Sequence, residues 1–175
     1  NREAFLGQFN MLARNFGAPY SALHFEGPHK SKLGFTTGTN LARISEEYPE
    51  YRNLWVERGA KQLFQYGITH DRWHTPLKEI QATDYHRHLL KPLDIDHSIG
   101  VLCDSKGDGS FAMLSLSRSQ SKGHFDQDTV QQLKYLQPHL QGIIQLYEQA
   151  YTLERRVHSL ESLIENTPQC LAQID

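Results

Sequence analysis

The spacing of apolar residues predicts that the chain opens with an amphipathic helix followed by a hairpin. Apolar side chains recur every three or four positions, at Phe5, Leu6, Phe9, Leu12, Ala13 and Phe16. Gly17 then fits the left-handed position that closes many helices. The alternating segment 19–25 predicts a strand, a Gly-Pro turn follows it, and 32–37 predicts a second strand.

The middle of the chain is predicted to be mainly helical. The segment 39–67 forms two helical pieces, the first capped by Thr39 or Asn40 and the second starting at Pro49. The short stretch 67–76 has no clear period and is expected to be irregular. One or two helical turns follow over 83–92, ended by a proline.

A second hairpin is the clearest β signal in the sequence. Strands are predicted over 97–103 and 110–118, joined through the turn pair Asp108-Gly109. Both strands carry apolar residues on both faces. We therefore expect both to lie centrally in a sheet whose two faces are largely covered.

The last third of the chain predicts one long helix. Phe125 and Val130 bracket Asp126, the pattern of a hydrophobic staple around an N-cap. Pro138 predicts a kink, since proline in a helix interior costs roughly 3 kcal/mol. Thr167-Pro168 is expected to end the helix.

A heptad pattern runs through this helix and predicts a parallel coiled coil. Its a and d positions are Ile143, Leu146, Ala150, Leu153, Val157, Leu160 and Ile164. Arg156 is a g position and Glu161 the following e position, an oppositely charged pair across a homodimer. The seam would span about 33 Å at 1.5 Å per residue. A helix packed only on its own domain is the alternative reading of this pattern.

The order of elements predicts an α+β fold, with an antiparallel sheet packed between helices in the PAS/GAF manner and a long C-terminal coiled-coil signalling helix. We divide the chain into a sensory domain (1–142), a dimerisation and signalling helix (143–166) and the start of a truncated following segment (167–175). The chain begins with Asn1 and ends within an apolar run, which suggests a part of a longer protein.

Composition and charge narrow the function classes. The formal charge of −2 gives no basic field for nucleic acid. No apolar run is long enough to cross a bilayer, and no signal peptide occurs, so no membrane partner is expected. Two cysteines, Cys103 and Cys170, indicate a reducing cytoplasm, with Cys103 as a small buried apolar residue.

The histidines and acidic residues do not form a specific catalytic or metal motif. His86 and His88 would lie about 200° apart on a helix and cannot share an ion. His70 and His74 are four apart but lack the glutamate of a zinc-protease helix, although a composite site with a later histidine is geometrically possible. No nucleophile elbow, dinucleotide or phosphate-loop motif occurs. We expect no catalytic residue, no metal and no cofactor.

The aromatic residues offer a better candidate for binding. Apolar pockets with a few polar groups are typical of small-molecule sites. The predicted ligand-binding residues are Tyr51, Trp55, Phe64, Tyr66, Trp73, Tyr85 and His97. The alternative is that they form ordinary core with partly exposed rings.

Four short motifs resemble the N-terminal sensory domain of LuxR-type bacterial transcriptional regulators. Their residues are Tyr85, Leu89, Pro92, Ile95 and His97; Leu116 and Arg118; Gly123, Phe125 and Asp128; and Leu136, Pro138, His139 and Leu140. The resemblance covers 85–147. Segment 48–73 lacks the Asp-Pro pair of autoinducer-binding domains, which argues against an acyl-homoserine-lactone ligand.

The resemblance implies a PAS/GAF-like sensory domain whose signalling helix leads to a helix-turn-helix. That DNA-binding element is absent from these residues, so DNA would be bound only through a missing part. We expect a cytoplasmic homodimer that senses an unknown small molecule and is not an enzyme. The alternatives are a ligand-free dimerisation module and a histidine-dependent metal sensor or enzyme.

Overall fold

A five-stranded antiparallel sheet, in the order β2-β1-β5-β4-β3, forms the centre of the molecule. The computed structural model describes residues 2–26, 35–37, 54–106 and 109–171. Within them the strands are β1 (Tyr20–Glu26), β2 (Phe35–Thr37), β3 (Ile68–His70), β4 (His97–Ser105) and β5 (Phe111–Arg118). The two predicted hairpins are β1–β2 and β4–β5, and β4 and β5 lie inside the sheet as predicted.

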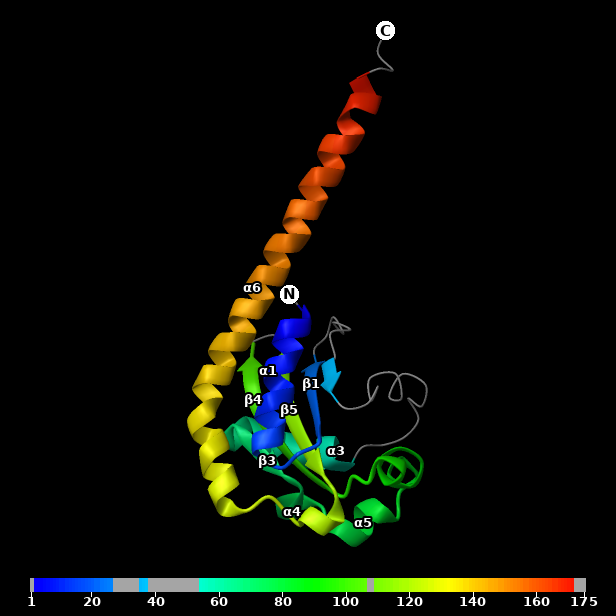
Figure 1. Cartoon of the computed structure of the whole chain (residues 1–175), viewed down its shortest axis with the longest axis vertical. Coiled ribbons are helices and arrows are strands. Elements are labelled where there is room, and N and C mark those ends of the chain that lie inside the picture. The colour runs from blue at the N-terminus through cyan, green and yellow to red at the C-terminus, as the bar shows by residue number, and fades with distance from the viewer. Residues whose placement is uncertain (1, 27–34, 38–53, 107–108, 172–175) are drawn as a thin grey trace.

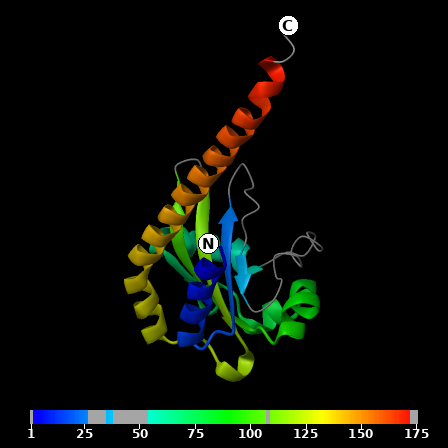
Figure 2. The same ribbon diagram turned by 45° about the horizontal axis from the view of Figure 1, so that its top comes forward.

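Two helices cover one face of the sheet, α1 (Arg2–Asn15) and the first part of α6 (Gln127–Leu171) (Figures 1 and 2). Gly17 ends α1 with a φ of 63°, and the N–H of Ala18 reaches back to the carbonyl of Ala13 at 2.9 Å. This hydrogen bond closes the helix. The closing residue is a glycine because only glycine adopts this left-handed conformation without strain. The predicted stop is confirmed.

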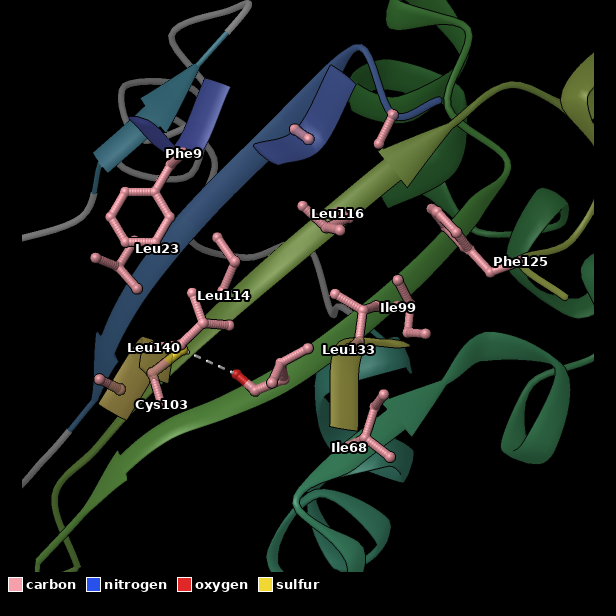
Figure 3. Close-up of a cluster of buried hydrophobic side chains, with 14 of the residues drawn as sticks. Phe9, Leu23, Ile68, Ile99, Cys103, Leu114, Leu116, Phe125, Leu133 and Leu140 are labelled. Carbon is pink, nitrogen blue, oxygen red and sulfur yellow. Dashed lines mark hydrogen bonds between the residues drawn. The ribbon is translucent and has the colours of Figure 1, made fainter. Parts of the chain in front are cut away.

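The main core lies between this face of the sheet and the two helices (Figure 3). Alternate residues of β4 and β5 point into it, and α1 and α6 add the facing side chains. Its buried members are Phe9, Ala13, Ala18, Leu23, Ile68, Ile99, Val101, Cys103, Ala112, Leu114, Leu116, Phe125, Val130, Leu133, Leu140 and Ile144. Burial raises the pKa of the Cys103 thiol to about 12, so this cysteine is the apolar packing residue that was predicted.

Shorter elements complete the fold. The helices are α3 (Leu54–Tyr66), α4 (Asp71–His74) and α5 (Leu77–Gln81), and the turns are the π-helical η1 (His86–Leu90) and the 3₁₀ turns η2 (Lys91–Leu93) and η3 (Gln120–Lys122). Leu63 of α3 packs with Leu102 and Met113, which alternate with the core residues and therefore lie on the second face. This face is thus covered in part by α3.

The C-terminal helix begins as predicted and ends later than predicted. The carboxylate of Asp126 accepts the N–H of Thr129 at 2.8 Å, and Phe125 and Val130 are both buried, so the N-cap and the staple are confirmed. The predicted end at Thr167 is wrong, because α6 continues to Leu171. Proline holds φ near the helical value, so the backbone can continue at the loss of one hydrogen bond.

The helix α6 continues through Pro138, where the sequence predicts a kink. It also runs without a break through the predicted domain boundary at 142/143, and its axis bends in its first third (Figure 1).

The prediction that 67–76 is irregular is wrong, since this segment contains β3 and α4. The predicted first helical piece after Thr39 lies outside the described residues. Within the described ranges, no helix has both the length and the apolarity that a membrane span requires.

We expect the contact between α6 and the sheet to dominate stability. Leu133 is fully buried, so Leu133→Ala removes packed methyl groups and leaves a cavity. The expected loss is roughly 2–5 kcal/mol in the free energy of unfolding, measured by urea denaturation. Gln132→Ala is the control on the exposed neighbouring position and should change it by less than about 0.5 kcal/mol. Equal losses in both variants would contradict this packing.

Candidate functional site

The junction between β3 and α4 brings polar side chains into the interior. Antiparallel pairing places His70 opposite Ile99, on the face covered by α6, and Asp71 follows as the first residue of α4. His97 opens β4 on the same face, and its Nδ1 lies 3.0 Å from Oδ2 of Asp71. His70, Asp71 and His97 are all buried. Buried polar groups must find partners.

Asp71 is surrounded by nitrogen atoms. Its Oδ1 lies 2.7 Å from Nδ1 of His70 and 3.6 Å from Nδ1 of His124, and it accepts the N–H of Arg72 at 2.7 Å. Burial by itself would raise the pKa of Asp71, but the contacts with His70 and His97 outweigh it and hold the pKa well below the usual range. The carboxylate is therefore a buried negative charge at neutral pH.

The same corner fixes the segment that leads into α6. Arg118 donates from Nε to the carbonyl of Gly123 at 2.8 Å and from Nη2 to the carbonyl of His124. Nε2 of His70 donates to the next carbonyl, that of Phe125, at 2.8 Å. The guanidinium of Arg118 also lies 4.0 Å from the centre of the Phe125 ring. Three successive carbonyls are thus held by side chains at the ends of β5 and β3.

We refer to His70, Asp71, His97 and His124 as the histidine–aspartate cluster. His124 differs from the other members, because its Nδ1 is buried and has no hydrogen-bond partner. Burial, followed by the neighbouring His97, lowers the pKa of His124 despite the nearby carboxylate of Asp71. The rings of His97 and His124 are 4.0 Å apart. The sequence analysis missed Asp71 and His124, whose only signal was their position beside His70 and beside the N-cap of α6.

The other three histidines considered from the sequence, His74, His86 and His88, have contacts of their own. Nε2 and Nδ1 of His74 contact the hydroxyls of Thr69 and Thr75 at 3.0 and 2.8 Å, so His74 does not join His70 in one site. His86 lies 3.1 Å from the carboxylate of Asp96, and His88 is exposed. His86 and His88 therefore point to different surroundings, as the helical spacing predicted.

Two of the predicted ligand-binding aromatic residues meet in a second cluster. Trp55 is buried together with Ile80, Leu90 and Ile95, and the partly buried residues around them are Tyr20, Leu54, Leu77, Tyr85 and Leu93. Burial raises the pKa of the Tyr85 hydroxyl to about 12, so it stays protonated at neutral pH. We refer to this group as the Trp55 cluster.

The remaining predicted residues lie elsewhere. Phe64 and Tyr66 are exposed at the end of α3, and Phe64 contacts the ring of Phe111 edge-on at 5.1 Å. Trp73 is partly exposed and stacks on His70 at 5.7 Å. His97 belongs to the histidine–aspartate cluster, and Tyr51 lies outside the described residues. The predicted ligand-binding residues that the structure describes therefore lie in three separate places: the Trp55 cluster, the exposed end of α3 and the histidine–aspartate cluster.

All seven predicted dimerisation residues are exposed. Ile143 is 37% exposed, Leu146 67%, Leu153 60%, Val157 51%, Leu160 59% and Ile164 70%, and Ala150 is also exposed. From Gln149 to Glu165 every residue of α6 is exposed, because the helix extends beyond the sheet (Figure 1). Ile144 and Tyr147, by contrast, pack on the core. The heptad seam is thus separate from the face that packs on the domain.

Comparison with known proteins identifies the fold. No protein-family model matches the sequence, and no curated protein matches it. The VqsR LBD domain from Pseudomonas aeruginosa matches with a TM-score of 0.53 and 14% identity, covering 82% of this chain and 88% of that one. The photoproduct state of GAF3 from Slr1393 of Synechocystis sp. PCC6803 matches with a TM-score of 0.54 and 14% identity, covering 89% and 98%. The chain has a GAF-like fold, so the predicted PAS/GAF-like α+β class is confirmed.

The buried carboxylate of Asp71 should make stability depend on acid. The pKa of Asp71 in the folded protein is below that of an unfolded aspartate, about 3.9. The ionised carboxylate therefore stabilises the fold above about pH 3.9, and this stabilisation is lost as the pH falls below that value. Between about pH 5 and 3, we expect the free energy of unfolding of the parent chain to fall more steeply than that of Asp71→Asn. The two slopes should differ by up to about 1.4 kcal/mol per pH unit. Asp128→Asn, at an exposed position, should keep the steep slope. Parallel denaturation curves for all three proteins would contradict the assignment.

Proposed function

We propose that this chain is the small-molecule-sensing and dimerisation domain of a LuxR-type transcription regulator, acting in the cytoplasm without catalysing a reaction. The observation that carries the proposal is the combination of a GAF-like fold with a long helix whose apolar seam is left exposed. The motifs over 85–147 that resemble LuxR-type sensory domains support it, as does the fold shared with a domain named LBD. DNA would be bound by a part of the regulator outside this chain.

The exposed seam supports dimerisation through α6. An isolated helix is marginal in water, and most of its stability comes from packing an apolar face. From Gln149 to Glu165, α6 is not buried by any of the residues that the structure describes, although it carries an apolar residue at every a and d position from Ala150 to Ile164. A second copy in parallel would cover the seam and pair Arg156 with Glu161 of the partner.

The Trp55 cluster supports a ligand site on the side of the domain away from the main core. An indole, two phenols and several aliphatic side chains gather there from α3, α5, η1 and the start of β1. Such a mixture of apolar surface and few polar groups suits a small, largely apolar molecule. Of the predicted ligand residues, we therefore place Trp55 and Tyr85 at the centre of the site.

The two functions would be coupled through the sheet. The core links β4 and β5 to Leu133, Leu140 and Ile144 of α6. Lys106, in the β4–β5 connection, also pairs with Glu148 at 2.7 Å, near the point where α6 leaves the domain. A ligand that binds one arrangement of the sheet more tightly than another would shift the position of α6, because only differential affinity moves an equilibrium.

Leu160→Asp should dissociate the dimer. The substitution places a charge at a d position, where it would have to be desolvated in the seam. Sedimentation equilibrium should give a dimer for the parent chain and a monomer for this variant. Ser159→Asp, which adds the same charge at the neighbouring c position, should remain dimeric. A parent chain that is monomeric at all concentrations would refute dimerisation but would leave the proposed ligand site unaffected.

A thermal-shift screen of metabolites tests the ligand site. A ligand at 100 times its Kd should stabilise the folded chain by about 2.7 kcal/mol. Trp55→Phe and Tyr85→Phe should weaken that stabilisation, because they change the buried indole and the partly buried phenol of the cluster. Tyr66→Phe, on the exposed end of α3, should keep it. A ligand whose effect is unchanged in the two cluster variants binds elsewhere.

A further inference from the structure

We infer that the histidine–aspartate cluster binds one divalent transition-metal ion, held by Nδ1 of His70, a carboxylate oxygen of Asp71 and Nδ1 of His124. This site is distinct from the Trp55 cluster, and it goes beyond the small-molecule sensing proposed above. The three ligand atoms all lie within 4.8 Å of one another. Imidazole and carboxylate groups are ordinary ligands of Zn²⁺, Fe²⁺ and related ions.

The separations of the ligand atoms can be compared with those of a metal coordination shell. Zinc binds such atoms at about 2.0–2.2 Å, so neighbouring ligand atoms of a tetrahedral site lie roughly 3.3–3.5 Å apart. The observed separations from Oδ1 of Asp71 are 2.7 Å to His70 and 3.6 Å to His124. The separation from His124 is close to that value, whereas the contact with His70 would have to widen by about 0.6 Å to admit an ion. Three protein ligands leave a fourth position open.

The hydrogen bonds of His70 leave its Nδ1 ready for a cation. Nε2 donates to the carbonyl of Phe125, and Nδ1 accepts the N–H of Arg72 at 3.0 Å. Nδ1 therefore presents a lone pair, only 2.7 Å from the carboxylate of Asp71. Two such atoms repel each other unless a positive charge lies between them, and either a proton on Nδ1 or a bound metal ion can supply that charge. When the ion is bound, the N–H of Arg72 still has Oδ1 of Asp71 as an acceptor at 2.7 Å.

His124 supplies the second, independent observation. Its Nδ1 is buried, unpartnered and 3.6 Å from the carboxylate, the arrangement of a ligand nitrogen that lacks its ion. The surroundings also resemble those of metal sites, in which outer groups orient the ligands. The carbonyl of Phe125 orients His70, and Nδ1 of His97 holds the second oxygen of Asp71 at 3.0 Å. Trp73 stacks on His70 and shields the ring from solvent.

The position of the site gives it a consequence for signalling. His70 and Asp71 belong to β3 and α4, whereas His124 lies two residues before the N-cap of α6. A bound ion would join these elements by coordinate bonds. It would add to the hydrogen bonds that already hold carbonyls 123–125. Metal binding would therefore stabilise the attachment of the signalling helix to the sheet.

Zinc titration of the 175-residue chain, after removal of metal with a chelator, tests the inference. We expect one equivalent of Zn²⁺ per chain by isothermal titration calorimetry and a higher Tm with the ion bound. His124→Gln should weaken binding at least 10-fold, because even loss of an outer group costs about that much. This variant loses no hydrogen bond at Nδ1. His88→Gln, at an exposed histidine outside the cluster, should bind as the parent does.

Cobalt provides a readout that needs no variant. Co²⁺ in the parent chain should give the intense visible absorption of a four- or five-coordinate ion, and added Zn²⁺ should remove it. Absence of stoichiometric Zn²⁺ uptake, or equal affinities in His124→Gln and His88→Gln, would overturn the site. A Co²⁺ spectrum like that of the hydrated ion would do the same. None of these results bears on the Trp55 cluster or on dimerisation.

Discussion

The attachment of α6 to the sheet is the contact on which the rest of the molecule depends. Its packing side chains share one core with β4 and β5, and the segment before it is held at three successive carbonyls by Arg118 and His70. These carbonyls precede the helix, so no intrahelical bond satisfies them, and partly buried carbonyls need partners. The guanidinium and imidazole provide them. If the domain acts on a distant part of its protein, as proposed above, this firmly held helix is the element through which it can do so.

The residues that carry the resemblance to LuxR-type sensory domains gather at this same attachment. His97, Arg118, Gly123 and Phe125 belong to three separate motifs, yet His97 contacts Asp71 while Arg118 binds the carbonyl of Gly123 and covers the ring of Phe125. The motifs thus describe how the sheet holds the helix and carry no information about a ligand. This explains why the sequence indicates the type of domain more clearly than its ligand.

Patterns local to one element could be predicted, and contacts between elements could not. The hairpins, the burial of β4 and β5, the N-cap at Asp126 and the stop at Gly17 follow from spacing and turn chemistry. The strand β3 was missed because three residues show no period, and it exists by pairing with β4. The histidine–aspartate cluster joins residues 70 and 124, and no spacing rule connects positions so far apart in the sequence.

The two apolar faces of α6 have a geometric consequence. Leu140, Ile144 and Tyr147 face the domain, whereas Ile143, Leu146 and Ala150 form the start of the seam. At about 100° per residue, these two faces are separated by roughly a quarter turn of one rigid rod. Two domains joined along such rods would project sideways, in opposite directions, from the common axis. Any repacking that turns the helix against its domain would rotate the far end of the helix by the same angle, so the change would arrive there as a rotation rather than a displacement.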